Sequence, residues 1–320
     1  MNGKNLNVQY RRNSYAKKRI KVIAAIIGIS LALLLILFLV IGGLLNDKVE
    51  DDKKEDSTRP VSDSEEKLPH AQLPSVKGYG ISLSGITTSA ISDKVSEISK
   101  ADGSGINFVV RDADGKEIYD SSLAQSMGKQ SSSNSYIEIG SIASRAANRG
   151  LRASAIVPVT AFSVKDDLER SVLLAYDAAL CAEISRDGAD DVLIRLQGSK
   201  VTEDSVDELV RLADTVKGIE DEALIGISLT REMLEEEGSE ILVAKLWESF
   251  DFLAFDITDI DTEDDPKEFA EENVNSEMHY YLLRYNMRVL LPDVVGDDLE
   301  DMVSVLTDKG LSNWQTVISN

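Results

Sequence analysis

Short apolar runs that alternate with helical segments constrain the fold of this 320-residue chain more than any other feature. The runs are rich in β-branched and aliphatic residues and do not alternate strictly with polar ones, which is typical of parallel strands covered on both faces. Eight such runs occupy residues 78–85, 106–112, 151–159, 191–197, 223–229, 250–257, 287–292 and 314–319. Helices are predicted between them at residues 92–101, 137–148, 166–186, 202–216, 239–250, 265–285 and 297–309.

This alternation predicts right-handed βαβ units and a parallel sheet. Eight strands are the number at which such a sheet closes, so residues 77–320 are predicted to form a (β/α)8 barrel of the TIM type. No helix is predicted after the eighth run, so the barrel would lack its final helix. The alternative is a doubly wound open sheet. It would usually carry a G-x-G-x-x-G loop after its first strand, and GISLSGITTS has none.

The amino-terminal part predicts a membrane anchor. A run of 24 uncharged residues begins at Val22 and ends at Leu45, long enough to cross a bilayer as one helix and too long for a cleaved signal. Residues 1–21 carry seven Lys and Arg and no acid, which places this tail in the cytoplasm and the barrel outside by the positive-inside rule. Residues 46–76 are polar and acidic and are predicted to be a disordered linker.

The net charge and the small numbers of cysteine and histidine residues argue against some classes of function. The net charge is −22 although the amino-terminal tail is basic, so the acidic outer part would repel a phosphate backbone and nucleic-acid binding is not expected. The single cysteine, Cys181, lies in an apolar stretch and is predicted to be buried. Two histidines, His70 and His279, are too few for a histidine-based zinc site. No metal and no cofactor is expected.

Candidate site residues follow from the barrel, because working side chains lie at the carboxyl ends of its strands. Asp256 and Asp293 end neighbouring strands and could form a carboxylate pair, while Asp112 ends the second strand and could join only across the mouth. The fourth strand ends in Arg195 and Gln197, with no carboxylate. Asp112, Arg195 and Gln197 are the candidate ligand-binding residues.

Two acidic motifs are predicted to be structural. The segment DITDIDTEDD at residues 256–265 lacks the glycine and glutamate of an EF-hand loop and is interpreted as a solvated loop. The sequence DADG at residues 112–115 is interpreted as a tight turn. Trp247 and Trp314 are expected in the core rather than as sugar-stacking platforms.

Three blocks of sequence carry a family resemblance: GINFVVRDADGKEIYDS at 105–121, IGSIASRAANRGLRASAIVPV at 139–159 and DGADDVLIRLQG at 187–198. Their order and spacing resemble a glycoside-hydrolase-like (β/α)8 barrel family of bacterial membrane-anchored surface proteins. The matching positions are Asn107, Val109, Val110, Asp112, Gly115, Tyr119, Ser121, Gly150, Leu151, Ala155, Val157, Gly188, Asp190, Asp191 and Val192. The likeness covers about 90 residues, and elsewhere only the strand–helix rhythm agrees.

The sequence differs from the family pattern at one position in the fourth strand. Where the family pattern has an aspartate late in the fourth strand, this chain has Arg195. A guanidinium cannot act as acid, base or nucleophile, although it can donate to sugar hydroxyls or carboxylates. The resemblance therefore implies a divergent barrel that has lost its ordinary glycosidase machinery.

Three functions stay open on the sequence alone. The first is a membrane-anchored, degenerate glycosidase-like barrel that binds a cell-wall polysaccharide or an envelope protein. The second is an active glycoside hydrolase that uses Asp256 and Asp293, or Asp112. The third is a structural or sensory ectodomain without a carbohydrate ligand.

Overall fold

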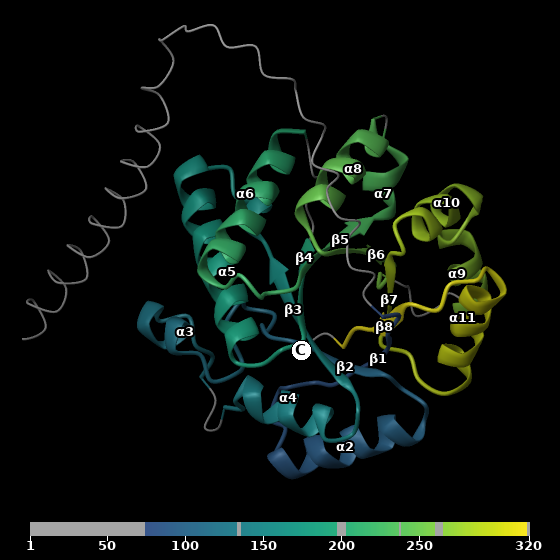
Figure 1. Cartoon of the computed structure of the whole chain (residues 1–320), viewed down its shortest axis with the longest axis horizontal. Helices are drawn as coiled ribbons and strands as arrows, with labels where there is room; N and C mark the ends of the chain where they lie inside the picture. Colours follow the sequence, from purple (N-terminus) through teal and green to yellow (C-terminus); the bar gives the residue numbers. More distant parts are fainter. Residues whose placement is uncertain (1–73, 133–135, 197–202, 237, 260–264, 319–320) are drawn as a thin grey trace, which may run out of the picture. The chain divides into compact units, whose positions relative to one another are not determined.

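The computed structural model describes residues 74–132, 136–196, 203–236, 238–259 and 265–318, and its carboxyl-terminal compact unit is a closed barrel of eight parallel strands (Figure 1). Each strand pairs with the next, and β8 pairs with β1. The strands are β1 (Lys77–Gly80), β2 (Gly105–Val109), β3 (Arg152–Val159), β4 (Asp191–Leu196), β5 (Ile225–Thr230), β6 (Phe252–Asp256), β7 (Arg288–Leu291) and β8 (Trp314–Thr316). The predicted TIM-type barrel is confirmed, and the open doubly wound sheet is wrong.

Helices form the outer ring, and most agree with prediction. They are α2 (Thr88–Lys100), α3 (Ser122–Met127), α4 (Ile139–Ala147), α5 (Asp167–Arg186), α6 (Glu203–Ile219), α7 (Arg231–Glu235), α8 (Ser239–Ser249), α9 (Pro266–Asn273), α10 (Ser276–Arg284) and α11 (Asp297–Asp308). Sequence patterns missed the short helices α3 and α7. The single helix predicted at 265–285 is two helices, because the Asn275 side chain accepts from two backbone N–H groups and starts α10.

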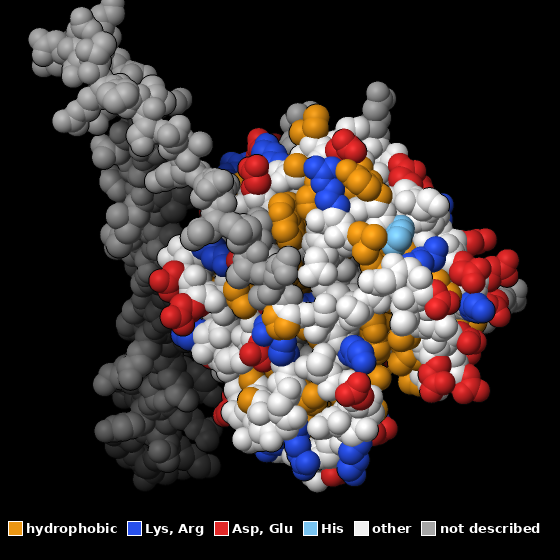
Figure 2. Space-filling view, turned by 45° about the vertical axis from the view of Figure 1, so that its right-hand side comes forward, with side chains coloured by type: hydrophobic (Ala, Val, Ile, Leu, Met, Phe, Trp, Pro, Cys, Tyr) orange, Lys and Arg blue, Asp and Glu red, His pale blue; other side chains and the backbone are white. Residues whose placement is uncertain are grey.

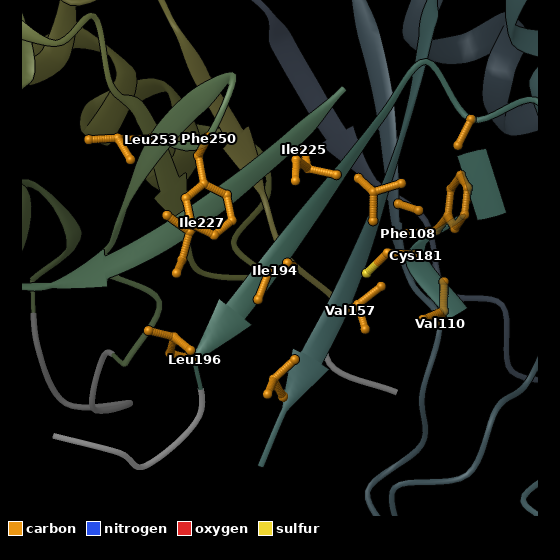
Figure 3. Packing of buried hydrophobic residues seen from close by; sticks show 14 of the residues in the cluster. Phe108, Val110, Val157, Cys181, Ile194, Leu196, Ile225, Ile227, Phe250 and Leu253 are labelled. Carbon is orange, nitrogen blue, oxygen red and sulfur yellow. The ribbon is translucent and has the colours of Figure 1, made fainter. Parts of the chain in front are cut away.

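Two hydrophobic layers hold the barrel together. The larger lies between the strands and the helices, and part of it is shown in Figure 3, where the Cys181 sulfur lies next to Val157. Cys181 is fully buried there, as predicted, and burial raises the pKa of its thiol. The smaller layer fills the barrel interior with Val109, Ile156, Leu193, Phe252, Ala254, Leu290 and Val317.

A glycine makes room for the largest of these interior side chains. Gly226 on β5 lies opposite Phe252 on β6. A Cβ at Gly226 would come within 2.3 Å of the Phe252 ring. Any larger residue at this position would therefore push the ring out of the interior.

A polar layer lies on the interior below these apolar side chains. Arg288 on β7 donates to both carboxylate oxygens of Asp191 on β4, at 3.0 and 3.3 Å, and to Gln315 on β8 at 3.1 Å. Its guanidinium also lies over the Phe252 ring, 4.4 Å from the centroid. Arg288 is 2% exposed, so this charge pair is sealed inside the barrel.

The sequence block after β2 forms an extension that is fixed to α5. Asp112 and Gly115 make the predicted tight turn, in which the Asp112 carboxylate accepts from the N–H groups of Asp114 and Lys116. Further along, Ser121 donates to the carboxylate of Glu183 on α5 at 2.5 Å, and Tyr119 donates to the same oxygen at 3.2 Å. Ser122 and the backbone N–H of Leu123 donate to its other oxygen. The positions that carry the family resemblance here therefore have a structural role.

Removing the Glu183 charge is expected to give a pH-dependent loss of stability. Burial alone would raise the pKa of Glu183, but the donors from Ser121, Ser122, Leu123 and Tyr119 lower it below its ordinary value of 4.5. A lowered pKa stabilises the fold above pH 4.5, and that contribution is lost as the pH falls through the folded value. Glu183→Gln should cost about 1 kcal/mol of unfolding free energy at pH 7, because solvent screens this half-buried group. Urea denaturation at several pH values should show the difference shrinking in acid, and a constant difference would contradict it.

The amino-terminal predictions lie outside the described residues. They are the basic tail 1–21, the anchor from Val22 to Leu45 and most of the linker 46–76. Within the part of the chain that the structure describes, no helix has the length and apolar character needed to span a membrane.

Candidate functional site at the barrel mouth

An arginine–aspartate pair occupies the carboxyl-terminal mouth of the barrel. Arg195, near the end of β4, donates from Nε to the Asp256 carboxylate at 2.7 Å, and from Nη2 to the Thr258 hydroxyl. Asp256, the last residue of β6, accepts from the Thr258 hydroxyl at 2.7 Å and from its backbone N–H at 3.1 Å through its other oxygen. The side chains are 14% and 7% exposed, so the pair is largely shielded from water. Both carboxylate oxygens of Asp256 are engaged.

Two cavities meet at Arg195. One has a volume of about 400 Å³ and is lined by Arg195, Thr230, Asp256, Thr258 and Phe269, among others. The other has a volume of about 210 Å³ and lies over β2 and β3, with Asp112, Lys129, Pro158, Thr160 and Arg195 in its lining. Because Arg195 lies in both linings, its guanidinium forms a shared wall. Its Nη1 group has no hydrogen-bond partner among the described residues.

The remaining predicted site residues are dispersed. Asp112 lies in the smaller cavity, but one of its oxygens is held by the turn described above. Asp293 is exposed and lines a third cavity, beside β1 and β8, rather than either cavity of the mouth. Gln197 lies outside the described residues. The structure thus brings together Arg195 and Asp256, and places Asp293 in a different cavity from Asp256.

A second charge cluster, which the sequence patterns missed, forms the wall of the smaller cavity. Arg111, just after β2, donates to Glu117 at 3.0 Å, to Asp177 on α5 at 2.5 Å and to the Pro158 carbonyl at 2.6 Å. Burial alone would lower the pKa of Arg111, but Asp177 and Glu117 raise it, so the guanidinium stays charged. One signal was present in the sequence: Asp177 is the only charge in the apolar stretch LLAYDAALCA.

Lys129 lies beside this cluster. Its ammonium is 4.4 Å from the centre of the Tyr176 ring, and no ion pair is found for it among the described residues. Since Arg111 is already bound on three sides, Lys129 and the Nη1 group of Arg195 are the cationic donors that the smaller cavity offers to a ligand. Thr160 and Asp112 add hydroxyl and carboxylate groups to the same lining.

Asp256 is not a free carboxyl group at this mouth. A hydrolysing pair of carboxyl groups needs one that can give or take a proton and another that attacks or activates water. In this mouth Asp256 is ion-paired to Arg195 and accepts two further hydrogen bonds from Thr258. Arg–Asp pairs with a free N–H edge can instead bind the hydroxyl groups of a sugar. Among the described residues, no group of three or more His, Cys, Asp and Glu side chains could hold a metal ion.

Comparison with solved structures shows the same fold. A protein of Bacteroides thetaiotaomicron proposed to be an alpha-L-fucosidase matches with a TM-score of 0.53 and 11% identity, over 80% of this chain and 91% of that one. An FMN-binding beta-glucuronidase from Facaelibacterium prausnitzii matches with a TM-score of 0.52 and 8% identity, over 78% of this chain and 38% of that one. No family model and no curated protein matches the chain.

These comparisons therefore identify the fold class of the chain. The chain carries a TIM-type (β/α)8 barrel, the fold of the two solved structures that it resembles. At these identities the likeness concerns the architecture alone, and the function must be argued from the mouth.

Proposed function

We propose that this protein is a membrane-anchored, extracytoplasmic glycosidase-like barrel that no longer cleaves glycans and binds a carbohydrate of the cell envelope at its mouth. The anchor is the uncharged run from Val22 to Leu45, and the seven basic residues before it orient the barrel outward. The barrel fold and the geometry of Arg195 support the binding role.

One observation carries the proposal: Arg195 stands at the mouth and its Nε is 2.7 Å from the Asp256 carboxylate. This ion pair occupies a carboxylate that a hydrolase would use, and it leaves the Nη1 group of Arg195, between two cavities, without a hydrogen-bond partner among the described residues. A fixed guanidinium is well suited to donating two hydrogen bonds to neighbouring hydroxyl groups. The site is thereby equipped to hold a sugar rather than to cut it.

Substituting Arg195 tests this function. The full chain in detergent should bind purified cell-wall polysaccharide, and Arg195→Ala should weaken that binding by about tenfold or more, the equivalent of 1.4 kcal/mol. Arg186→Ala is a matched control, because Arg186 forms an ion pair with Glu220 near the end of α5 and lines neither mouth cavity. Binding is measured by calorimetry or by co-sedimentation.

Three results would contradict the proposal. Equal binding by Arg195→Ala and the unaltered chain would place any glycan site elsewhere. Release of reducing sugar by the unaltered chain, abolished by Asp256→Asn, would show an active hydrolase. Capture of a membrane protein with no glycan binding would favour the sensory alternative.

A further inference from the structure

The outer wall of the barrel carries a shallow groove between α8 and α10, which lie side by side in the ring of helices (Figure 1). Its volume is about 450 Å³, and its lining includes Ile241, Ala244 and Lys245 of α8 and Arg284 at the end of α10. None of its lining residues belongs to either cavity of the mouth. The groove is therefore a separate surface of the barrel.

Packed aromatic rings join the two helices that form the walls of this groove. The Trp247 ring of α8 meets the Tyr285 ring edge-on, with the ring centres 5.6 Å apart, and Tyr285 stacks on Tyr281 at 6.4 Å. The hydroxyls of Tyr281 and Ser239, the first residue of α8, are 3.1 Å apart. These contacts fix α8 and α10 relative to each other, so the groove is preformed.

Large hydrophobic side chains are exposed on both walls. Ile241 on α8 is 76% exposed, and Leu283 and Tyr280 on α10 are 53% and 50% exposed. Tyr280, Leu283 and Arg284 are three and four residues apart and so share one face of α10. The Arg284 guanidinium lies 5.6 Å from the centre of the Tyr280 ring. Aromatic and arginine side chains on a preformed surface are typical of a protein interface.

Charges of both signs border these hydrophobic side chains. Together α8 and α10 carry three acids and two bases, which are Glu240, Lys245, Glu248, Glu277 and Arg284. By contrast, α11 carries five acids and no base. In Figure 2, acidic side chains gather at the right of the molecule, whereas hydrophobic, basic and acidic side chains lie next to one another toward its top. The surface over α8 and α10 is thus close to neutral.

This distribution of charge indicates which partner fits the surface. The chain has a net charge of −22, so two copies repel each other unless they meet through nearly neutral faces. A twofold axis brings the same face of two copies together, and each wall of the groove then meets the opposite wall of the second copy. Glu240 lies on one wall and Arg284 on the other, and neither has an ion pair among the described residues. The face is therefore complementary in charge to a second copy of itself.

We propose that the α8/α10 face, formed by Glu240, Ile241, Tyr280, Leu283 and Arg284, is the contact of a twofold homodimer. Ile241 of each copy enters the groove of the other, and Glu240 of each copy pairs with Arg284 of the other. This inference depends on neither carbohydrate binding at the mouth nor the membrane anchor.

The size of the face sets the strength of this dimer. With eleven residues, α8 is about 16 Å long, and two helices side by side are about 20 Å wide, so the face has an outline of roughly 300 Å² per copy. A stable complex buries about 800 Å² per partner. The dimer is therefore weak and reversible, and its dissociation constant is expected between about 1 μM and 1 mM.

An exchange of charges tests the contact in the full chain, by sedimentation equilibrium in a detergent matched to the density of the solvent. Glu240→Arg and Arg284→Glu each place like charges opposite each other twice in the dimer. Each should weaken it about tenfold or more, the equivalent of 1.4 kcal/mol. The double variant Glu240→Arg/Arg284→Glu brings opposite charges together again and should regain the dissociation constant of the unaltered chain.

The matched controls are Glu97→Arg and Lys94→Glu, which change the net charge by the same amounts. Lys94 and Glu97 form an exposed ion pair on α2, away from the α8/α10 face. Neither control should alter the dissociation constant by more than a small factor.

A substitution of Ile241 gives a second readout. Ile241→Asp places a charge where the hydrophobic side chain enters the groove and should leave the chain monomeric up to about 1 mM. Val295→Asp is its control, since Val295 is 77% exposed against 76% for Ile241, and it should leave the dimer intact.

Two outcomes would overturn the inference. If the unaltered chain stayed monomeric up to about 1 mM, the α8/α10 face would be left to a different partner. If the chain dimerised and Ile241→Asp and both single charge reversals left the dimer unchanged, the association would arise elsewhere in the chain.

Discussion

Arg288→Met is expected to lower the free energy of unfolding by about 3–5 kcal/mol, because it leaves the buried Asp191 carboxylate without its main partner. Asp191 is fully buried, and burial alone would raise its pKa, but Arg288 lowers it. The carboxylate is therefore ionised in the folded barrel. Without the guanidinium it must either remain charged in an apolar interior or take up a proton, and both cost stability. Urea denaturation at pH 7 measures the loss.

A double variant separates the charge effect from the loss of packing. Arg288→Met combined with Asp191→Leu removes both charges and should regain most of the lost stability, since a buried ion pair can often be replaced by apolar side chains of similar volume. Arg152, which contacts Asp191 at 3.3 Å and is 25% exposed, can turn toward solvent in that background. A cost of Arg288→Met below about 1 kcal/mol, the range of exposed ion pairs, would contradict the sealed interior pair.

Arg111→Met should cost a similar amount, about 3–5 kcal/mol, because it leaves two buried carboxylates facing each other across the wall of the smaller mouth cavity. Glu117 is fully buried and Asp177 is 3% exposed. One oxygen of Glu117 lacks a hydrogen-bond partner among the described residues even with Arg111 in place. The same substitution removes the donor to the Pro158 carbonyl and should loosen the attachment of the β2 extension to α5.

The matched control for this prediction is Arg186→Met. Its ion pair with Glu220 is exposed, and it should contribute less than about 1 kcal/mol. If Arg111→Met unfolded at the same urea concentration as Arg186→Met, the buried cluster would have no special role in stability.

The strands could be predicted because both faces of each strand are covered, so each strand is a short run of mostly apolar residues. The run DVLIRL of β4 is an example. Contacts between residues that are far apart in the sequence could not be predicted in this way. Arg195 and Asp256 are 61 residues apart, and whether they pair depends on both side chains pointing into the mouth. Asp256 and Asp293 follow neighbouring strands, yet Asp293 follows Pro292 into a loop beside β1 and lines another cavity. Strand order fixes which ends are adjacent but not where the loops after them turn.

The buried polar layer of Arg288 and Asp191 also limits how a conformational change could pass from one end of the barrel to the other. Arg288 and Asp191 form an ion pair in the barrel interior, and Phe252 and Leu290 pack above it. Side chains therefore fill the axis of the barrel. Solid, well-packed interiors switch between discrete arrangements rather than deform gradually. A conformational change at the mouth is therefore not expected to pass along the barrel axis to the end where β1 begins. It would have to pass around the outside, through the loops and the helices that the mouth residues touch, of which α5 is joined to the cavity wall by Asp177.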